Sequence, residues 1–461
     1  MGVEGNRLLF IILACLVFLA QFGEGGAAPL AQFTLQLLVL SGTAVALLLP
    51  SSGVPWKGAT RGVLTAAVGF MAVAFLSCLH SPYPYASFLR ILDWLLPLGV
   101  LTIALRRRWE EGEKSLLADV VLAAAALQAG LVLFGMSRGT SASILKGFGL
   151  LNTNHEAAYL LAAALLTFPR LDFRNFRWAS SARAVALLLC LLAFTLLMSR
   201  GALLGLLAGA MVLLAFRWKS FSARERLVTA VSVGLVVAAG AVALVSRFGA
   251  VEDPYRYQRL GIWGADLRCF AGHPLLGVGA GVFRHAADRF NFPLEGPVRF
   301  GRSFETPHSD YLGLLAEMGL LGLTAGLVLL IRSLRFLAGL RRQQDRIAEG
   351  LLAVGAALAV QGLVEDLSTR PALLVTMASL LGACLAGAGL GKPTSARQGP
   401  HFFQTRALGI LGLALFGWIA LRNPYLAFVK DQAMRRSNTY HDMEKNFRAA
   451  IRLNPYQAST Y

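Results

Sequence analysis

Long apolar runs recur along the chain, and short polar segments separate them. A helix needs about 20 apolar residues to cross the hydrocarbon core of a bilayer. Thirteen ranges approach that length: 8–22, 29–50, 62–80, 85–105, 115–136, 151–168, 184–199, 201–217, 227–246, 309–331, 347–367, 371–390 and 407–421. The pattern predicts an all-α, polytopic membrane protein of about 12–13 transmembrane helices, with residues 1–421 as its transmembrane domain.

The first apolar range also has features of a signal peptide. Arg7 precedes it, and the small-residue stretch 25–28 follows it. We expect an uncleaved first helix, and either choice leaves the remaining topology unchanged.

Composition agrees with a membrane protein. The chain is 56% hydrophobic and 15% charged, whereas soluble domains carry about 25% charged residues. The net charge of +18 would indicate nucleic-acid binding in a soluble protein. With the N-terminus in the cytoplasm, however, the inside segments hold more than half of the 43 Lys and Arg residues. Because cytoplasmic loops collect these residues, the charge is explained by orientation, and no nucleic-acid partner is expected.

Two predicted extracytoplasmic regions are too long to be simple connectors: the large periplasmic loop 247–308 and the C-terminal tail 422–461. In the tail, 424–457 fits one tetratricopeptide repeat, with Phe447 and Pro455 at expected positions. The alternative is a single amphipathic helix. Since a lone repeat cannot bury its own face, either the chain is a truncated piece of a longer protein or the tail packs on something else. Such repeats bind proteins, so a protein partner through the tail is expected.

Two polar residues next to apolar runs are candidates for chemistry. Arg200 lies in a turn between two predicted spans, where Gly201 allows close backbone approach. It is either an anion-binding residue or an interfacial arginine that extends to water. His308 follows Pro307 at the start of a span, where a helix dipole disfavours the imidazolium and keeps a neutral base available. The alternative is an ordinary interfacial histidine.

The large loop contains two further patterns. Residues 259–270 have apolar positions near helical spacing and predict an amphipathic helix at the membrane interface. The glycines at 277, 279 and 281 have the spacing of a dinucleotide fingerprint, but no strand precedes them and no βαβ unit surrounds them. We therefore reject that interpretation and expect a flexible turn.

Several segments in order along 150–390 together resemble the O-antigen ligase and polymerase family of bacterial membrane enzymes. They are Gly149-Leu-Leu-Asn152-Thr-Asn154-His-Glu-Ala-Ala158, Ser199-Arg200-Gly201, Arg259 through Trp263, Pro274-Leu-Leu-Gly-Val-Gly279 with Phe283, His308-Ser-Asp-Tyr-Leu, Glu317-Met-Gly-Leu-Leu-Gly322, and Val364-Glu-Asp366-Leu with Pro371. The chain departs from the family at Ser309 and Asp310, where many members have His-Asn. This departure leaves the exact substrate open.

The resemblance implies transfer of a glycan from a polyprenyl-pyrophosphate carrier to an acceptor hydroxyl outside the bacterial cytoplasmic (inner) membrane. Arg200 and Arg259 would hold the pyrophosphate through bidentate hydrogen bonds, and His308 would act as general base. The other matching positions imply substrate-binding roles for Asn152, Asn154, Trp263, Asp310, Tyr311 and Glu317. No cofactor is expected, and no metal, because the arginines would supply the positive charge.

Other functions remain open. Within the family, the chain could be a ligase, a polymerase that extends repeat units, or an enzyme that glycosylates proteins; the acceptor is accordingly a lipid, a glycan or a protein. A transporter could use the charged residues within predicted spans, Arg90, Asp93, Asp119 and Glu156. Against it, the sequence shows no internal repeat, and Arg90 and Asp93 have the spacing of a helical ion pair. A membrane-anchored scaffold would leave Arg200, Arg259 and His308 without a role.

Overall fold

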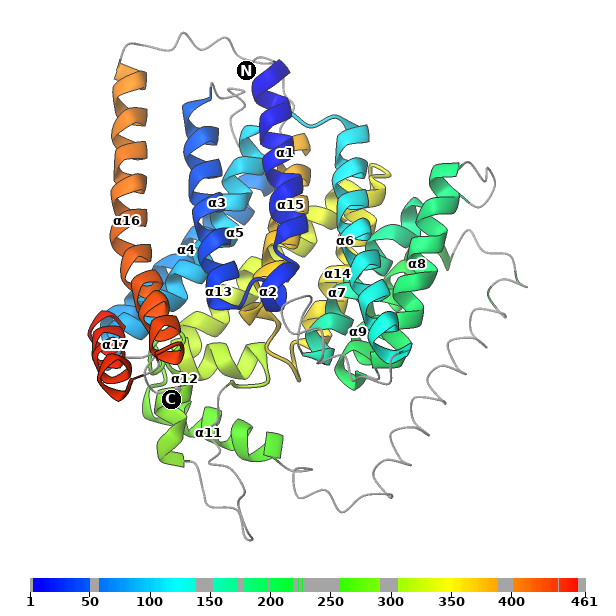
Figure 1. Cartoon of the computed structure of the whole chain (residues 1–461). Helices are drawn as coiled ribbons and strands as arrows, with labels where there is room; N and C mark the ends of the chain where they lie inside the picture. The colour runs from blue at the N-terminus through cyan, green and yellow to red at the C-terminus, as the bar shows by residue number, and fades with distance from the viewer. Residues whose placement is uncertain are drawn as a thin grey trace.

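The computed structural model consists of helices (Figure 1). It describes residues 3–49, 58–137, 152–172, 178–197, 199–218, 223, 226, 258–290, 306–388, 401–437 and 439–454. No strand occurs among these residues. The predicted span at 227–246 and parts of the large loop, 247–257 and 291–305, lie outside the described residues.

Eight helices are long and apolar enough to cross a membrane. They are α3 (Pro29–Leu48), α4 (Gly58–His80), α5 (Pro84–Arg106), α6 (Glu111–Ser137), α8 (Trp178–Leu197), α9 (Arg200–Arg217), α13 (Asp310–Arg341) and α15 (Pro371–Ala388). Each overlaps one of the predicted apolar ranges. The all-α polytopic fold class predicted from the sequence is therefore confirmed.

Four further predicted ranges are helical but are not among those eight. They are α1 (Val3–Leu19), α7 (Thr153–Thr167), α14 (Arg346–Gln361) and α16 (His401–Arg435). The first three have only 17, 15 and 16 residues. The described residues thus hold fewer full-length spans than the 12–13 predicted. Among these four, α7 is buried along nearly its whole length, and a helix that is apolar all round can be a core helix instead of an independent span.

Helices α7, α9 and α14 pack together in one part of the main hydrophobic core. Cβ atoms at Gly205 and Gly209 would lie 2.8 and 2.9 Å from backbone oxygens of Ala357 and Ala353 in α14. Small residues four apart allow this close approach of two helices, as in other membrane helix pairs. The contact holds the middle of α9 against the middle of α14.

The two ends of the bundle differ in character (Figure 1). The end that holds the N-terminus, which we call the N-terminal end, carries Arg106, Arg217 and Arg341 in the last turns of α5, α9 and α13. The opposite end, the α11 end, carries the short helices α2 (Phe22–Gly25), α11 (Gln258–Gly272), α12 (Phe283–Ala287) and α17 (Tyr440–Leu453), together with η4 (Asp288–Phe290) and η5 (Leu367–Thr369). The remaining short helix is η2 (Phe168–Arg170).

The described part of the tail forms two packed helices, because α16 continues beyond its predicted end at 421 to Arg435 and α17 follows. The tail contacts the transmembrane part: Tyr85 donates a hydrogen bond to the Leu453 carbonyl (3.4 Å), and the Phe33 and Tyr425 rings stack at 4.3 Å. The tail is therefore not the single amphipathic helix considered as an alternative. Its assignment as a tetratricopeptide repeat stays a prediction.

Candidate functional site

Two adjacent acidic residues, Glu365 and Asp366, lie at the centre of a polar cluster at the α11 end. They follow α14 in the loop before α15, and their side chains are only 1% and 4% exposed. The first residue of α13 holds this loop in place. The Asp310 carboxylate accepts hydrogen bonds from the backbone N–H groups of Leu367 (3.2 Å) and Ser368 (2.9 Å), and its own N–H donates to the Gly362 carbonyl (2.8 Å).

Arg259 reaches Glu365 from the first turn of α11. Its Nη2 contacts Glu365 Oε1, and Asn154 Nδ2 donates to the same oxygen at 2.6 Å. The Arg259 side chain is 41% exposed although its partner is buried. One side of the guanidinium is thus fixed by protein, while the exposed part can contact a ligand. Burial raises the pKa of Glu365, and the Arg259 charge opposes that rise.

His308 faces the same pair of carboxylates. Its Nδ1 lies 4.0 Å from Glu365 Oε2 and 3.9 Å from Asp366 Oδ1. The residue has φ = 50°, a left-handed conformation that is uncommon in non-glycine residues and recurs at functional sites. Ser309 caps α13 by accepting the Leu312 N–H, so His308 lies just before the helix, near the position predicted.

Burial holds the pKa of His308 below its usual value, while Asp366 acts in the opposite direction and Arg259 adds to the lowering. The result, a neutral imidazole near pH 7, is the one expected from the sequence. The largest cause in the structure is loss of water around the charged form, whereas the sequence argument relied on the helix dipole.

The Ser199-Arg200-Gly201 turn lies against the loop that carries the carboxylates. A Cβ on Gly201 would be 3.0 Å from Val364 Cγ2 and 3.5 Å from Glu365 Cγ. Ser199 caps α9 by accepting the Ala202 N–H. The Arg200 side chain is exposed. The backbone approach expected at Gly201 is therefore present, and it places Arg200 at the edge of the cluster.

A backbone bridge joins the helix of Arg259 to the helix that follows His308. Helix α13 is kinked at Gly319 (φ = 64°), which leaves carbonyls of Ala316 and Glu317 without helical partners. The N–H groups of Val278 and Gly279 donate to these two carbonyls at 3.0 and 2.9 Å. The segment expected to be a flexible turn is thus packed into the kink, and its glycines provide close approach.

The remaining predicted residues have partners within the chain. The Asn152 side chain caps α7 by accepting the Asn154 N–H, Tyr311 donates to the Ala359 carbonyl (2.9 Å), and Glu317 accepts the Phe283 N–H (3.2 Å). Trp263 lies one turn after Arg259 in α11, and its Nε1 is buried without a hydrogen-bond partner. These bonds give Asn152, Tyr311 and Glu317 structural roles. Asp310 has one too, because it holds the loop after α14. Substrate contact by any of these residues stays a prediction.

Sequence reasoning assigned no site role to His155, Glu365 or Asp366, although all three lie in segments that carry the family resemblance. Ligand atoms of these three residues lie within 4.8 Å of one another, and such residue types can bind divalent cations. Here Arg259 and Asn154 already contact Glu365, and His308 faces both carboxylates. Because cationic and donor groups of the chain already face these carboxylates, we do not assign the cluster as a metal site.

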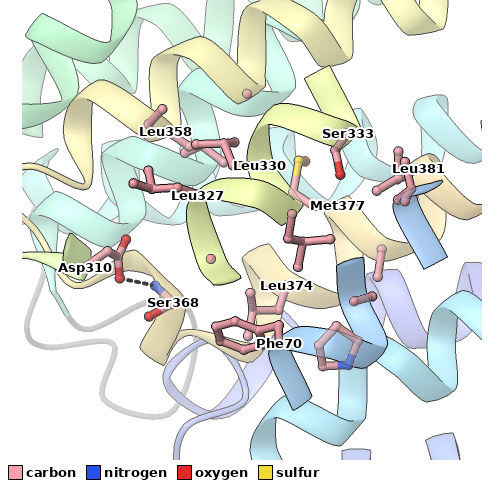
Figure 2. A pocket seen from close by; sticks show the side chains of 18 of the residues that line it. Phe70, Asp310, Leu327, Leu330, Ser333, Leu358, Ser368, Leu374, Met377 and Leu381 are labelled. Atoms are coloured by element: carbon pink, nitrogen blue, oxygen red, sulfur yellow. Dashed lines mark hydrogen bonds between the residues drawn. The ribbon is translucent and has the colours of Figure 1, made fainter. Parts of the chain in front are cut away.

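An apolar cavity begins beside the cluster. It has a volume of about 440 Å³ and lies among α4, α5, α13, α14 and α15. Figure 2 shows Asp310 and Ser368, joined by their hydrogen bond, at one side, and Leu327, Leu330 and Leu358 along the lining. The lining is almost entirely hydrocarbon, as expected of a site for an apolar chain.

Fold and cluster together define a helical, polytopic membrane protein with a polar site at one end of its apolar helices. Residues 185–327 match the family model described as O-antigen ligase. This match confirms the resemblance drawn from the sequence, and it includes Arg200, Arg259 and His308. No curated protein matches the chain. The family implies a membrane enzyme of the glycosyl-transferring ligase or polymerase type.

Proposed function

We propose that this protein transfers a glycan from a polyprenyl-pyrophosphate carrier to an acceptor hydroxyl at the α11 end. One observation carries the proposal: Arg259 and His308, from separate segments, converge on the same buried carboxylate pair. A cation for a phosphate and a neutral base for a hydroxyl are the two groups that such a displacement needs.

Each group has a defined part in the reaction. His308 takes the proton of the acceptor hydroxyl as that oxygen attacks the anomeric carbon. The bond from this carbon to the pyrophosphate oxygen breaks, and polyprenyl pyrophosphate leaves with the electron pair. Arg259 and Arg200 stabilise the negative charge of the leaving group, since guanidinium groups match phosphate oxygens in bidentate hydrogen bonds. A single displacement of this kind inverts the anomeric configuration.

Three structural features support the carboxylates in this scheme. Asn154 and Glu365 hold one side of Arg259, and Asp366 lies near the Nδ1 side of His308. A carboxylate there stabilises the imidazolium that forms when the other ring nitrogen accepts a proton, as in other His–carboxylate pairs. The apolar cavity beside Asp310 accommodates part of the hydrocarbon chain of the donor. The arginines supply the positive charge, so the reaction needs no metal or cofactor.

The transporter alternative loses most of its support from side-chain contacts. Arg90 Nη1 lies 4.0 Å from Asp93 Oδ2, the pairing expected from their spacing, and Gln36 donates to Asp93 at 3.2 Å. Asp119 pairs with Arg170 and Arg183. These charges therefore have structural partners in the protein and do not need a transport path to explain them.

The test is to delete the gene in the cells that make this protein and analyse the glycans on lipid carrier by mass spectrometry. Accumulated full-length chains would indicate a ligase, and single repeat units would indicate a polymerase. Carrier-linked glycan together with loss of a glycoprotein would indicate a protein acceptor. An unchanged pool of carrier-linked glycan would contradict the proposed function.

A further inference from the structure

The cluster contains a buried histidine that the proposed reaction does not use. His155 lies in the first turn of α7, and its side chain is 1% exposed. Neither ring nitrogen has a hydrogen bond of good geometry. Oδ1 of Asp366 lies 3.5 Å from Nε2. A polar ring excluded from water needs a partner, and Asp366 is the group within reach.

The same carboxylate oxygen serves two imidazoles. Asp366 Oδ1 lies 3.5 Å from His155 Nε2 and 3.9 Å from His308 Nδ1. A carboxylate accepts several hydrogen bonds, but each donor withdraws part of its negative charge from the others. The strength with which Asp366 stabilises the His308 imidazolium therefore depends on what His155 does.

We infer that His155 is a positioning residue: its Nε2–H holds the Asp366 carboxylate and limits how strongly Asp366 stabilises protonated His308. The link between His155 and Asp366 does not depend on the proposed function. Its consequence for catalysis does, because only there does His308 act as a base that His155 helps to keep neutral. The two buried ends of the link come from α7 and from the loop after α14. These elements also meet at Gln361, whose Nε2 donates to the Asn154 carbonyl at 3.1 Å.

The direction of the effect is the same for either charge state of His155. As a neutral donor it occupies part of the Asp366 carboxylate, and as a cation it also repels protonated His308. Removing it must therefore raise the pKa of His308. The charged or titratable groups around His155, Asp366 and His308 are Arg259 of α11, Asp310 and Glu317 of α13, and Glu365, Asp366 and Arg370 of the loop after α14.

The experiment reads the protonation of His308 directly. Of the two forms of a histidine side chain, diethyl pyrocarbonate modifies the neutral imidazole, and the His308 side chain is 32% exposed. The modification rate of the peptide that contains His308 is measured by mass spectrometry against pH, on the full chain in lipid nanodiscs. In His155→Leu we expect the half-point of this rate to move upward by roughly 0.5–1 pH unit.

Conservative variants separate positioning from a merely structural role. The amide nitrogen of Gln lies close to the place of Nε2, so His155→Gln restores the donor and should keep the wild-type half-point. Asn is too short to reach Asp366, so His155→Asn should shift like His155→Leu, and it provides a polar variant if the leucine protein does not accumulate. His285→Leu, which removes a histidine that packs on Tyr83 at the same end, should leave the half-point unchanged.

An unmoved half-point in His155→Leu or His155→Asn would overturn the inference, as would equal shifts in the Gln and Leu variants. The labelling does not depend on glycan transfer. Full transfer by a His308→Ala protein would remove the proposed base whatever the labelling shows, whereas an unmoved half-point would remove only the role of His155.

Discussion

Arg259 and His308 share Glu365 as a partner, and His308 also faces Asp366. This arrangement determines what a substitution at each position changes. Glu365 is buried, so removing Arg259 leaves a carboxylate without its cation, a change that also reduces stability. His308 is partly exposed, and its nearest carboxylate atoms lie 3.9 and 4.0 Å away. Its removal breaks no direct hydrogen bond. A His308 variant therefore tests the role in glycan transfer with less effect on stability than an Arg259 variant.

We expect His308→Ala to lower glycan transfer by about 10²–10⁴-fold, the usual contribution of a general base. The protein should still insert and accumulate, because no close contact is lost. Transfer in isolated membranes from lipid-linked glycan checks the result, with His285→Ala as the matched histidine control. Normal transfer by His308→Ala would exclude this residue as the base.

The pH dependence of transfer follows from the burial of His308. Burial lowers the pKa of this imidazole below the ordinary value of about 6.5. The neutral base is therefore fully present above that pH and is lost as the pH falls through the lowered pKa. We expect the acid limb of kcat/KM to have its midpoint below about 6.5. A midpoint above that value would contradict the assignment.

Arg200 offers a test of pyrophosphate binding that leaves the core undisturbed, because its side chain is exposed. Arg200→Lys keeps the charge but loses the bidentate fork. Transfer should fall by at least about tenfold. The loss should be smaller than the roughly 10²–10³-fold seen when a charge-stabilising donor is removed completely. The change Arg448→Lys, on an exposed residue of α17, is the control, and equal activity of the two variants would count against bidentate binding.

Sequence alone could place some of these residues but not their partners. Arg200, Arg259 and His308 stand out as polar residues beside apolar runs. The pairing of Arg259 with Glu365 joins positions 106 residues apart, and no local spacing reports such a contact. The pairing of His155 with Asp366 was not predicted for the same reason: a lone histidine in the first turn of an apolar helix has no visible partner until the loop after α14 is folded against it.

At the scale of elements, the kink of α13 decides where Arg259 lies relative to His308. The bridge 274–281 donates its N–H groups to the carbonyls that the kink exposes, and Leu320 and Leu321 donate back to the Pro274 and Leu275 carbonyls at 2.8 and 3.3 Å. Four backbone hydrogen bonds thus fix the end of α11 to the middle of α13. The apolar run 309–331 predicted this helix but not its kink, because the partner that stabilises the kink is a separate segment.

We expect Gly319→Ala to destabilise the protein by roughly 1–2 kcal/mol or more, since a left-handed alanine is strained. In addition, its Cβ would lie 2.4 Å from the Leu275 carbonyl carbon. The displaced bridge should carry α11 and Arg259 away from Glu365, so transfer falls together with the melting temperature.

Gly264→Ala is the matched control for this change. It lies on α11, where an added Cβ meets nothing within 4 Å, and alanine is the better helix former by up to about 1 kcal/mol. Its melting temperature should be equal to or above that of the wild type. A Gly319→Ala protein with wild-type stability and transfer would show that the bridge does not position Arg259.

In the whole molecule, the basic ends of the helices and the candidate site lie at opposite ends of the bundle. The last turns of α5, α9 and α13 carry arginines at the N-terminal end, whereas the carboxylate cluster lies at the α11 end (Figure 1). Basic residues in short loops remain in the cytoplasm. We therefore predict that the proposed reaction takes place on the extracytoplasmic side, and this orientation can be tested without a substrate.

Two exposed aromatic residues mark the two ends: Trp178 at the start of α8 is 84% exposed, and Tyr440 of α17 is 76% exposed. In a Cys15→Ser background, which removes the exposed native cysteine, a membrane-impermeant maleimide should label Tyr440→Cys in intact spheroplasts. It should label Trp178→Cys only after lysis, because we predict that the basic segment around this residue is cytoplasmic. The reverse pattern would place the carboxylate cluster in the cytoplasm, where an acceptor outside the membrane could not reach His308.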